Sequence, residues 1–156
     1  MADSDKNPRP SPEKRLQEYL DSKSLRKTPE RFAILKKALE LKAHFGSGDL
    51  VKAFDKGDYH ISRATIFNTL EILCDSGILR RHHFESNQAR YEVAGGNHLH
   101  LVCTECGKIK EVNDPEQTHN IMSMEFDRFT PSYFSATIYG TCDACARRKL
   151  RNRKTI

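Results

Sequence analysis

The sequence predicts an α+β protein made of two small domains, and three observations lead to this fold class. In the first half, apolar residues recur at the spacing of amphipathic helices, and two short β-like runs follow them. Residues 94–97 (Ala-Gly-Gly-Asn) have the composition of a linker. After them the pattern changes to short strands, one helix and two Cys-x-x-Cys pairs, which is typical of a small α/β module.

The first half carries the signals of a winged helix-turn-helix domain. Helices are expected over residues 12–22, 29–41, 49–54 and 62–76, and strands over residues 78–84 and 90–93. Thr28 and Ser62 are expected to cap the second and fourth helices, and Gly77 to end the fourth. Four helices and a hairpin within about 85 residues fit this motif. We expect the domain to occupy residues 13–94, and residues 1–12, which hold three prolines, to be disordered.

The second half is expected to form a smaller α/β domain at residues 98–145, after a hinge at residues 95–97. Strands are expected around Leu99 and Leu101 and over residues 108–112 and 132–139, with a helix over residues 115–129. A domain of roughly 50 residues buries little apolar surface, so a bound metal would supply part of its folding free energy.

A basic tail, residues 146–156, completes the chain. The 156 residues include 26 Lys and Arg against 21 Asp and Glu, a formal net charge of +5. The tail contributes six basic residues and no acidic one: Arg147, Arg148, Lys149, Arg151, Arg153 and Lys154. Without them, 20 basic residues face 21 acidic ones, so the rest of the chain is nearly neutral. The tail either adds contacts to nucleic-acid phosphates or is a disordered, solubilising segment.

The sequence does not predict membrane insertion or export. No apolar stretch approaches the ~18 residues of a membrane span, and the N-terminus lacks the apolar region of a signal peptide. We therefore expect a cytoplasmic protein. In that compartment five cysteines indicate metal binding or free thiols rather than disulfides.

Four of the cysteines form two pairs with metal-ligand spacing, Cys103 with Cys106 and Cys142 with Cys145. Two such turns offer four thiolates to one tetrahedral ion, which predicts one structural Zn²⁺ per subunit. A redox dithiol is the alternative. The remaining Cys74 lies beside apolar helix positions and is interpreted as a buried apolar residue.

A second metal site is predicted near the start of the second half. His98 and His100 alternate along a strand, so both face one side, ~6.6 Å apart. Glu111 follows on the neighbouring strand, and Glu92 and His44 are further candidate ligands. Such a set without sulfur suits Fe(II), Mn(II) or Zn(II). The alternative is a scatter of surface histidines, and the other four are interpreted as solvated: His60, His82, His83 and His119.

Several longer motifs follow one another in a fixed order. They are Arg26-Lys-Thr-Pro-Glu-Arg31, His44-Phe-Gly-Ser-Gly-Asp-Leu50, Ser62-Arg-Ala-Thr-Ile-Phe-Asn-Thr-Leu70, Gly77-Ile-Leu-Arg-Arg-His-His-Phe-Glu85, Tyr91-Glu92 and His98-Leu-His-Leu-Val-Cys-Thr-Glu-Cys-Gly107. With them, the chain from about Glu13 to Cys145 resembles the ferric uptake regulator superfamily of metal-dependent bacterial transcription factors, and its iron-sensing branch most of all.

The resemblance implies a homodimeric regulator, usually a repressor, whose winged-helix domain is hinged to a zinc-containing dimerisation domain. The sensory metal, with Fe²⁺ favoured and Mn²⁺ or Zn²⁺ as substitutes, would bind at the hinge to five residues: His44, Glu92, His98, His100 and Glu111. By fixing the angle between the domains, the ion would fit two recognition helices to successive major grooves of a double-stranded DNA operator, ~34 Å apart.

Some details differ between branches of the superfamily. Glu92 stands where peroxide sensors tend to have Asp, and zinc sensors place a cysteine nearby, so Glu92 favours iron. The Arg26–Arg31 stretch and Asn68 resemble peroxide sensors, which makes peroxide sensing the alternative. The third metal site of some members is expected to be absent or rebuilt, since its ligand positions hold Asn97, Leu99, Thr118 and Phe134.

The helix from Ser62 is expected to enter the major groove, with four residues outward: Arg63, Thr65, Phe67 and Asn68. The superfamily usually has Tyr-Arg where this chain has Phe67-Asn68. Because Asn pairs with adenine and Arg with guanine, we expect an operator preference shifted toward A·T pairs. Arg26 matches a position that reaches the minor groove, and the candidate phosphate contacts are Lys14, Arg15 and Arg31.

Two other classes of function fit parts of the pattern. An enzyme would use a similar His/carboxylate site, but five protein ligands leave little room for substrate, and no acid/base or nucleophile constellation accompanies them. A zinc-scaffolded interaction protein without specific DNA binding fits Phe67-Asn68 but not the winged-helix pattern. We therefore expect a DNA-binding regulator and not an enzyme.

Overall fold

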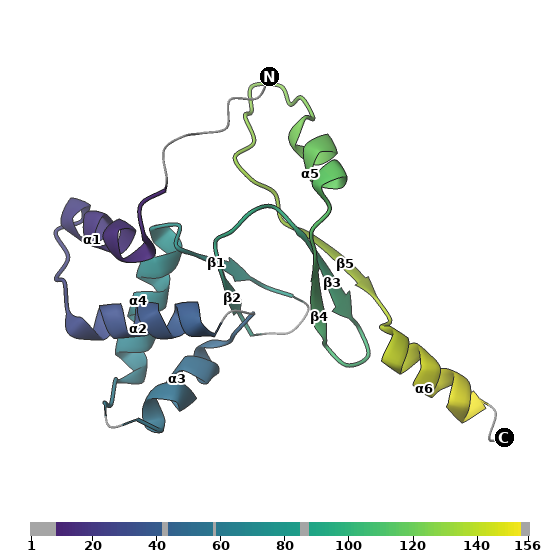
Figure 1. Cartoon of the computed structure of the whole chain (residues 1–156), viewed down its shortest axis with the longest axis horizontal. Coiled ribbons are helices and arrows are strands. Elements are labelled where there is room, and N and C mark those ends of the chain that lie inside the picture. Colours follow the sequence, from purple (N-terminus) through teal and green to yellow (C-terminus); the bar gives the residue numbers. More distant parts are fainter. Residues whose placement is uncertain (1–8, 42–43, 58, 85–87, 154–156) are drawn as a thin grey trace. The chain divides into compact units, whose positions relative to one another are not determined.

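The computed structural model contains helices and small sheets, which confirms the predicted α+β class (Figure 1). Contacts divide the chain into two compact units, Met1–Ala94 and Gly95–Ile156. Most of the segment expected to be disordered lies outside the described residues, and Pro12 already belongs to a helix. The structure describes residues 9–41, 44–57, 59–84 and 88–153.

The first unit has four helices followed by an antiparallel hairpin. Its elements are α1 (Pro12–Ser22), α2 (Pro29–Glu40), α3 (Ser47–Asp55), α4 (Arg63–Asp75), β1 (Leu79–His82) and β2 (Arg90–Val93). α2 crosses α4, which also packs against α3 and β1 (Figure 1). In the hairpin Arg80 pairs with Glu92, and His82 with Arg90. This order and packing confirm the predicted winged helix-turn-helix.

The core of this unit lies on the inward faces of its helices. Its fully buried side chains include Leu16, Leu20, Ile34, Leu35, Leu50, Ile66, Leu70 and Leu73. Ser62 caps α4 as expected, since its Oγ accepts a hydrogen bond from the Thr65 amide at 3.2 Å. Gly77 follows α4 with φ +68°, a conformation that glycine adopts without steric cost. The cap predicted for Thr28 is wrong, because its side chain makes no capping hydrogen bond and Pro29 alone marks the start of α2.

The second unit contains a three-stranded sheet and two helices. Its elements are β3 (Leu99–Cys103), β4 (Ile109–Val112), α5 (Pro115–Met122), β5 (Ala136–Gly140) and α6 (Asp143–Arg153). The strand order is β4-β3-β5, with β3 antiparallel to β4 and parallel to β5. The central strand therefore has a partner on each side, and its register places Glu111 directly opposite His100.

Two expected elements of this unit are shorter than predicted. The helix expected over residues 115–129 ends at Met122, and the chain beyond it bends back so that Phe126 and Phe129 form an isolated bridge. Arg128 has φ +54°, which no α-helix accommodates. The strand expected from residue 132 begins at Ala136. The apolar residues at helical spacing after Met122 therefore predicted a continuation of the helix that the structure does not contain.

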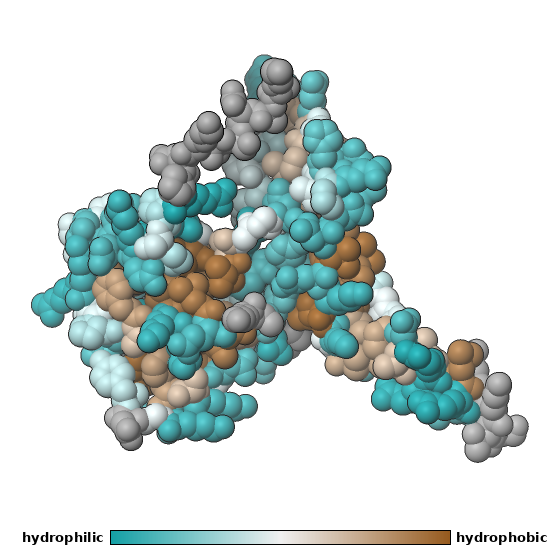
Figure 2. Space-filling model, viewed as in Figure 1, coloured by the Kyte–Doolittle hydropathy of each residue, from teal (hydrophilic) through white to brown (hydrophobic). Residues whose placement is uncertain are grey.

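The basic tail is part of a helix, so the disordered alternative is wrong for the described residues. α6 begins at Asp143 and includes Cys145, and its surface is mostly hydrophilic (Figure 2). Lys149 Nζ lies 2.6 Å from a carboxylate oxygen of Glu105 in the turn after β3. None of the described helices is both long enough and apolar enough to span a membrane.

Candidate metal centres and DNA-reading face

Four cysteines from separate parts of the second unit meet at one point. Cys103 ends β3, Cys106 lies in the following turn, Cys142 precedes α6 and Cys145 lies in its first turn. Their sulfur atoms all lie within 4.8 Å of one another, and Sγ of Cys106 is 3.9 Å from Sγ of Cys142. Zinc–sulfur bonds of ~2.3 Å in a tetrahedron separate neighbouring sulfurs by ~3.8 Å. The donor set and its spacing fit a structural zinc ion.

The surroundings of these sulfurs shift the pKa values of two thiols in opposite directions. The backbone amide of Cys142 donates to Sγ of Cys103 at 3.3 Å, and this bond is the largest of several hydrogen bonds that lower the pKa of Cys103 to about 6. Burial raises the pKa of Cys145 to about 12, and a metal ion is what would keep such a buried group ionised. Arg148 Nη2 lies 3.6 Å from Sγ of Cys145, so a tail residue supplies positive charge at the sulfur cluster. This role of Arg148 was not predicted from the sequence.

Imidazole and carboxylate groups gather on β3 and β4 of the same unit. His98 Nδ1 donates to the carbonyl of Gly96 at 3.1 Å, which leaves Nε2 with its lone pair. That Nε2 lies 3.0 Å from Nε2 of His100, whose side chain is buried. Glu111 offers a carboxylate oxygen within 4.8 Å of both imidazoles. The structure thus brings three predicted ligands together within this unit.

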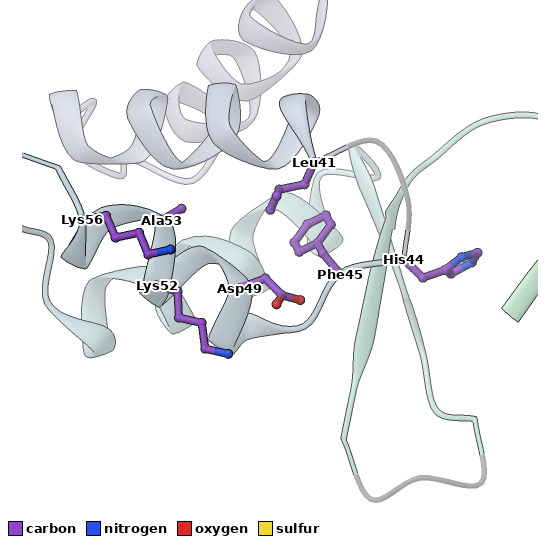
Figure 3. A pocket seen from close by; sticks show the side chains of 7 residues that line it. All are labelled: Leu41, His44, Phe45, Asp49, Lys52, Ala53 and Lys56. Atoms are coloured by element: carbon purple, nitrogen blue, oxygen red, sulfur yellow. The ribbon is translucent and has the colours of Figure 1, made fainter. Parts of the chain in front are cut away.

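The first unit brings two other predicted ligands together. Phe45 and Tyr91 form an isolated antiparallel bridge, which places His44 beside Glu92. His44 Nε2 and Glu92 Oε2 are 2.9 Å apart, and both side chains are nearly buried. Phe45 turns toward Leu41 beside a hollow of about 410 Å³, whereas His44 points in the opposite direction (Figure 3).

His82 belongs to the same group, although its sequence context predicted a solvated side chain. That interpretation is wrong, since its side chain is only 9% exposed and its Nε2 lies 2.8 Å from Glu92 Oε1. Arg80 pairs with Glu92 across the hairpin, so His82, two residues along, lies on the same face as the carboxylate. The sequence shows that Arg80 and His82 are two residues apart and so share one face of a strand. It does not show that this face lies opposite Glu92, because that depends on the pairing of β1 with β2.

The third metal site of some superfamily members was expected to be absent or rebuilt here, and the structure shows where the residues at its positions lie. Asn97 is used differently, since its Oδ1 accepts a hydrogen bond from the backbone amide of Phe134 at 3.4 Å. Leu99 lies in β3 and Thr118 in α5. Through this hydrogen bond Asn97 connects the segment before β3 to the segment before β5.

The face of α4 opposite the core is open to solvent. Arg63, Phe67 and Asn68 are exposed, with 49% of Phe67 accessible, whereas Thr65 is partly buried and bonded to Ser62. Arg31, Thr65 and Asn68 line a hollow of about 360 Å³ beside the first turns of α2 and α4. Arg26 is exposed, and its carbonyl accepts a hydrogen bond from Nη1 of Arg31 at 2.5 Å. The predicted DNA-reading residues therefore surround the start of one accessible helix.

Arg15, expected as a phosphate contact, has hydrogen-bond partners within the first unit. Its Nη2 donates to the carbonyl of Gly77 at 2.8 Å and to that of Ser76 at 3.3 Å. These carbonyls follow the end of α4, where positive charge is favourable. Arg15 therefore connects α1 to the C-terminal end of α4, a role that no local pattern in the sequence predicts.

Comparisons with known proteins identify a family to which the chain is similar. The profile of the ferric uptake regulator family matches residues 22–128. The chain is 28% identical over 133 residues to the peroxide operon regulator of Bacillus subtilis, covering 85% of this chain and 92% of that protein. It is 29% identical over 127 residues to a peroxide-responsive repressor of Staphylococcus saprophyticus, covering 81% and 86%.

Solved structures of similar proteins come from the same family. The ferric uptake regulator of Pseudomonas aeruginosa with manganese superposes with a TM-score of 0.71 at 25% identity, covering 81% of this chain and 97% of that one. The ferric uptake regulator of Vibrio cholerae superposes with a TM-score of 0.62 at 28% identity, covering 81% and 98%.

Proposed function

Because the chain belongs to the ferric uptake regulator family, whose members are metal-responsive transcription regulators and not enzymes, we propose that it is an Fe(II)-responsive, DNA-binding repressor. One observation carries the proposal. Each compact unit holds an incomplete set of metal ligands, His44 with Glu92 in the first and His98, His100 and Glu111 in the second. Two or three protein ligands bind a divalent ion weakly, whereas all five together would occupy most of its coordination positions.

These residues fit a hard or borderline divalent ion. Imidazole nitrogens and carboxylate oxygens without sulfur suit Fe(II) and Mn(II), and bonds of ~2.1 Å to a six-coordinate ion place adjacent ligand atoms ~3.0 Å apart. The separations of 2.9 Å between His44 and Glu92 and of 3.0 Å between His98 and His100 support this fit. Ligands from both units on a single ion would restrict the angle between them and so favour the DNA-binding conformation.

The exposed face of α4 supports DNA reading. We propose that Arg63, Thr65, Phe67 and Asn68 contact bases in the major groove while Arg26 and Arg31 approach the backbone or the minor groove. Side chains of α4 that are fully buried, such as Leu70, hold the helix against the core and leave the polar side outward.

A homodimer is supported by apolar side chains that the second unit leaves exposed. They include Met124, Phe126, Phe129, Tyr133, Ile138 and Tyr139. Exposed apolar side chains in such number are typical of a subunit interface. Sedimentation analysis of Ile138→Glu is expected to show a monomer, and Leu150→Glu on the exposed side of α6 should remain a dimer.

The four cysteines are proposed to bind one structural Zn²⁺ per subunit. Cys142→Ser should lower the zinc content from about one ion per chain to nearly none and unfold the second unit, since zinc supplies part of its folding free energy. Cys74→Ser is the matched control, because Cys74 lies in the first unit and should leave the zinc content unchanged. Equal zinc content in both variants would exclude the cysteine cluster.

The proposed function is tested by anaerobic binding measurements. The affinities for Fe(II), Mn(II) and Zn(II), and the metal dependence of binding to DNA selected from a random library, are compared between the wild type and His98→Ala. The substitution should weaken Fe(II) binding and abolish metal-dependent DNA binding. His119→Ala, at an exposed position of α5, is the control. Unchanged Fe(II) and DNA affinities in His98→Ala would exclude the proposed site, and failure of the wild type to bind any DNA would favour an interaction protein.

Peroxide sensing is a second candidate, since both similar curated proteins described above are named peroxide regulators. It would use the same metal ligands. Treating the Fe(II)-loaded protein with hydrogen peroxide discriminates the two functions. Loss of DNA binding with oxidation of a site histidine, seen by peptide mass spectrometry, would indicate a peroxide sensor. Retained binding would indicate an iron sensor.

A further inference from the structure

We propose that His82 positions the Glu92 carboxylate of the regulatory metal site, so that only the oxygen facing His44 is available to the ion. The inference rests on the proposed function, because it assumes that His44 and Glu92 are ligands. In this proposal His82 does not coordinate the ion, but it determines which oxygen of Glu92 does.

The two oxygens of Glu92 have different partners. Oε2 lies 2.9 Å from His44 Nε2, whereas Oε1 lies 2.8 Å from His82 Nε2. The side chain of Glu92 is only 5% exposed, so solvent offers Oε1 little alternative to the imidazole. An N–H of His82 that donates to Oε1 therefore fixes the rotation of the carboxylate.

The surrounding fold fixes His82 in turn. The hairpin register places His82 and Glu92 on one face of β1 and β2. The ring of Phe84 stacks on His82 at 5.5 Å and meets the ring of His44 edge-on at 5.6 Å. Phe84 is itself buried, so this apolar ring shields the hydrogen bond from water, and a shielded hydrogen bond to a charged group is stronger than an exposed one.

A carboxylate held in this way is prepared for coordination through one oxygen. Ligating carboxylates are commonly hydrogen-bonded by a neighbouring residue, and loss of that residue costs roughly 10- to 100-fold in metal affinity. Without His82, Glu92 would have to lose rotational freedom each time an ion binds. The oxygen beside His44 would also no longer be the only one presented.

The test measures Mn(II) affinity by calorimetry in the full-length, zinc-loaded protein. His82→Ala should bind Mn(II) roughly 10- to 100-fold more weakly than the wild type. His82→Gln should restore most of the affinity, since its amide nitrogen can donate to Oε1 from about the position of Nε2. His83→Ala is the matched control, because His83 is the exposed neighbour in the sequence and should bind as the wild type does. The Co(II) absorption spectrum of His82→Gln should match that of the wild type.

Three outcomes would overturn the inference. Unchanged Mn(II) affinity in His82→Ala would show that Glu92 needs no positioning partner. Equal weakening in the Ala and Gln variants would show that a donor is not what matters, and a changed Co(II) spectrum would identify His82 as a ligand. His98→Ala distinguishes failure of the positioning role of His82 from failure of the proposed metal site. If it loses Mn(II) binding while His82→Ala does not, only the positioning role fails, and if neither loses it, the proposed site fails as well.

Discussion

Phe45 and Tyr91 exchange two backbone hydrogen bonds, of 3.0 and 2.8 Å, across a bridge that joins the segment before α3 to β2. Their rings stack at 5.8 Å, and both residues are buried. The bridge sets the neighbouring positions, His44 and Glu92, side by side. Packing in the core of the first unit therefore determines the spacing of two proposed metal ligands.

Phe45→Ala is expected to lower the free energy of unfolding by about 3–5 kcal/mol, because it empties a buried aromatic site. Urea denaturation of the zinc-loaded protein measures the change. Phe67→Ala is the control, since Phe67 is 49% exposed on α4 and its loss should cost less than about 0.5 kcal/mol. Similar costs for the two substitutions would show that the stacked pair contributes little to the core.

Arg15→Met should destabilise the first unit by about 1 kcal/mol, because two carbonyls at the end of α4 lose their donor. Met keeps most of the apolar stem, so the change isolates the hydrogen bonds. Thermal unfolding is compared with that of Lys14→Met, which alters an exposed neighbour. If Arg15→Met unfolds at the same temperature as the wild type but binds DNA more weakly, Arg15 would be a phosphate contact and not a structural residue.

Cys74 is partly buried against the core, short of the full burial expected from the sequence. It should resist alkylation at neutral pH, because this burial raises its pKa to about 11. Iodoacetamide reacts with the thiolate, which predominates only when the pH exceeds the pKa. At pH 8, three units below the pKa, roughly one Cys74 side chain in a thousand is ionised. Mass spectrometry of the zinc-loaded protein treated with iodoacetamide should show a rate that rises tenfold per pH unit up to about pH 10. The denatured protein provides the comparison, and an equally fast reaction in the folded state would contradict the burial of this thiol.

Asn68→Ala is expected to weaken binding to the selected operator by about 1–3 kcal/mol and to relax selection at one A·T pair, since Asn bonds both polar atoms of an adenine edge. Arg31→Ala should weaken binding to all sequences alike and reduce the salt dependence by about one unit of slope. Binding-site selection followed by anisotropy titrations at several salt concentrations measures both effects. A strong guanine at the position read by Asn68 would contradict the assignment.

Local signals in the sequence were sufficient for most helices. Pro12 and Pro29 mark the first residues of α1 and α2, and Ser62 and Gly77 bound α4, because caps and positive φ angles depend on a few adjacent residues. The same reasoning failed after Met122. There the apolar spacing predicted more helix, but the backbone turns at Arg128 and brings Phe126 to Phe129.

Side chains that meet across the fold were harder to assign. From composition alone the tail was a candidate for disorder, yet Lys149 pairs with Glu105 in the turn after β3. Arg15 has the sequence context of a surface charge but caps a helix far along the chain. These partners are 44 and 62 residues apart in the chain, so their contacts depend on tertiary packing.

By itself, the sequence determined the α+β class, the two cysteine pairs and the choice of histidines and carboxylates as candidate ligands, because residue type and short spacing fix which chemistry a segment can perform. Only the tertiary structure decided which of these groups lie within bonding distance. The register of β1 with β2 turns His82 from an apparent surface residue into the buried partner of Glu92, and the Phe45–Tyr91 bridge brings His44 to the other oxygen of the same carboxylate. Strand register and core packing are cooperative properties of residues far apart in the chain, so no local pattern encodes them.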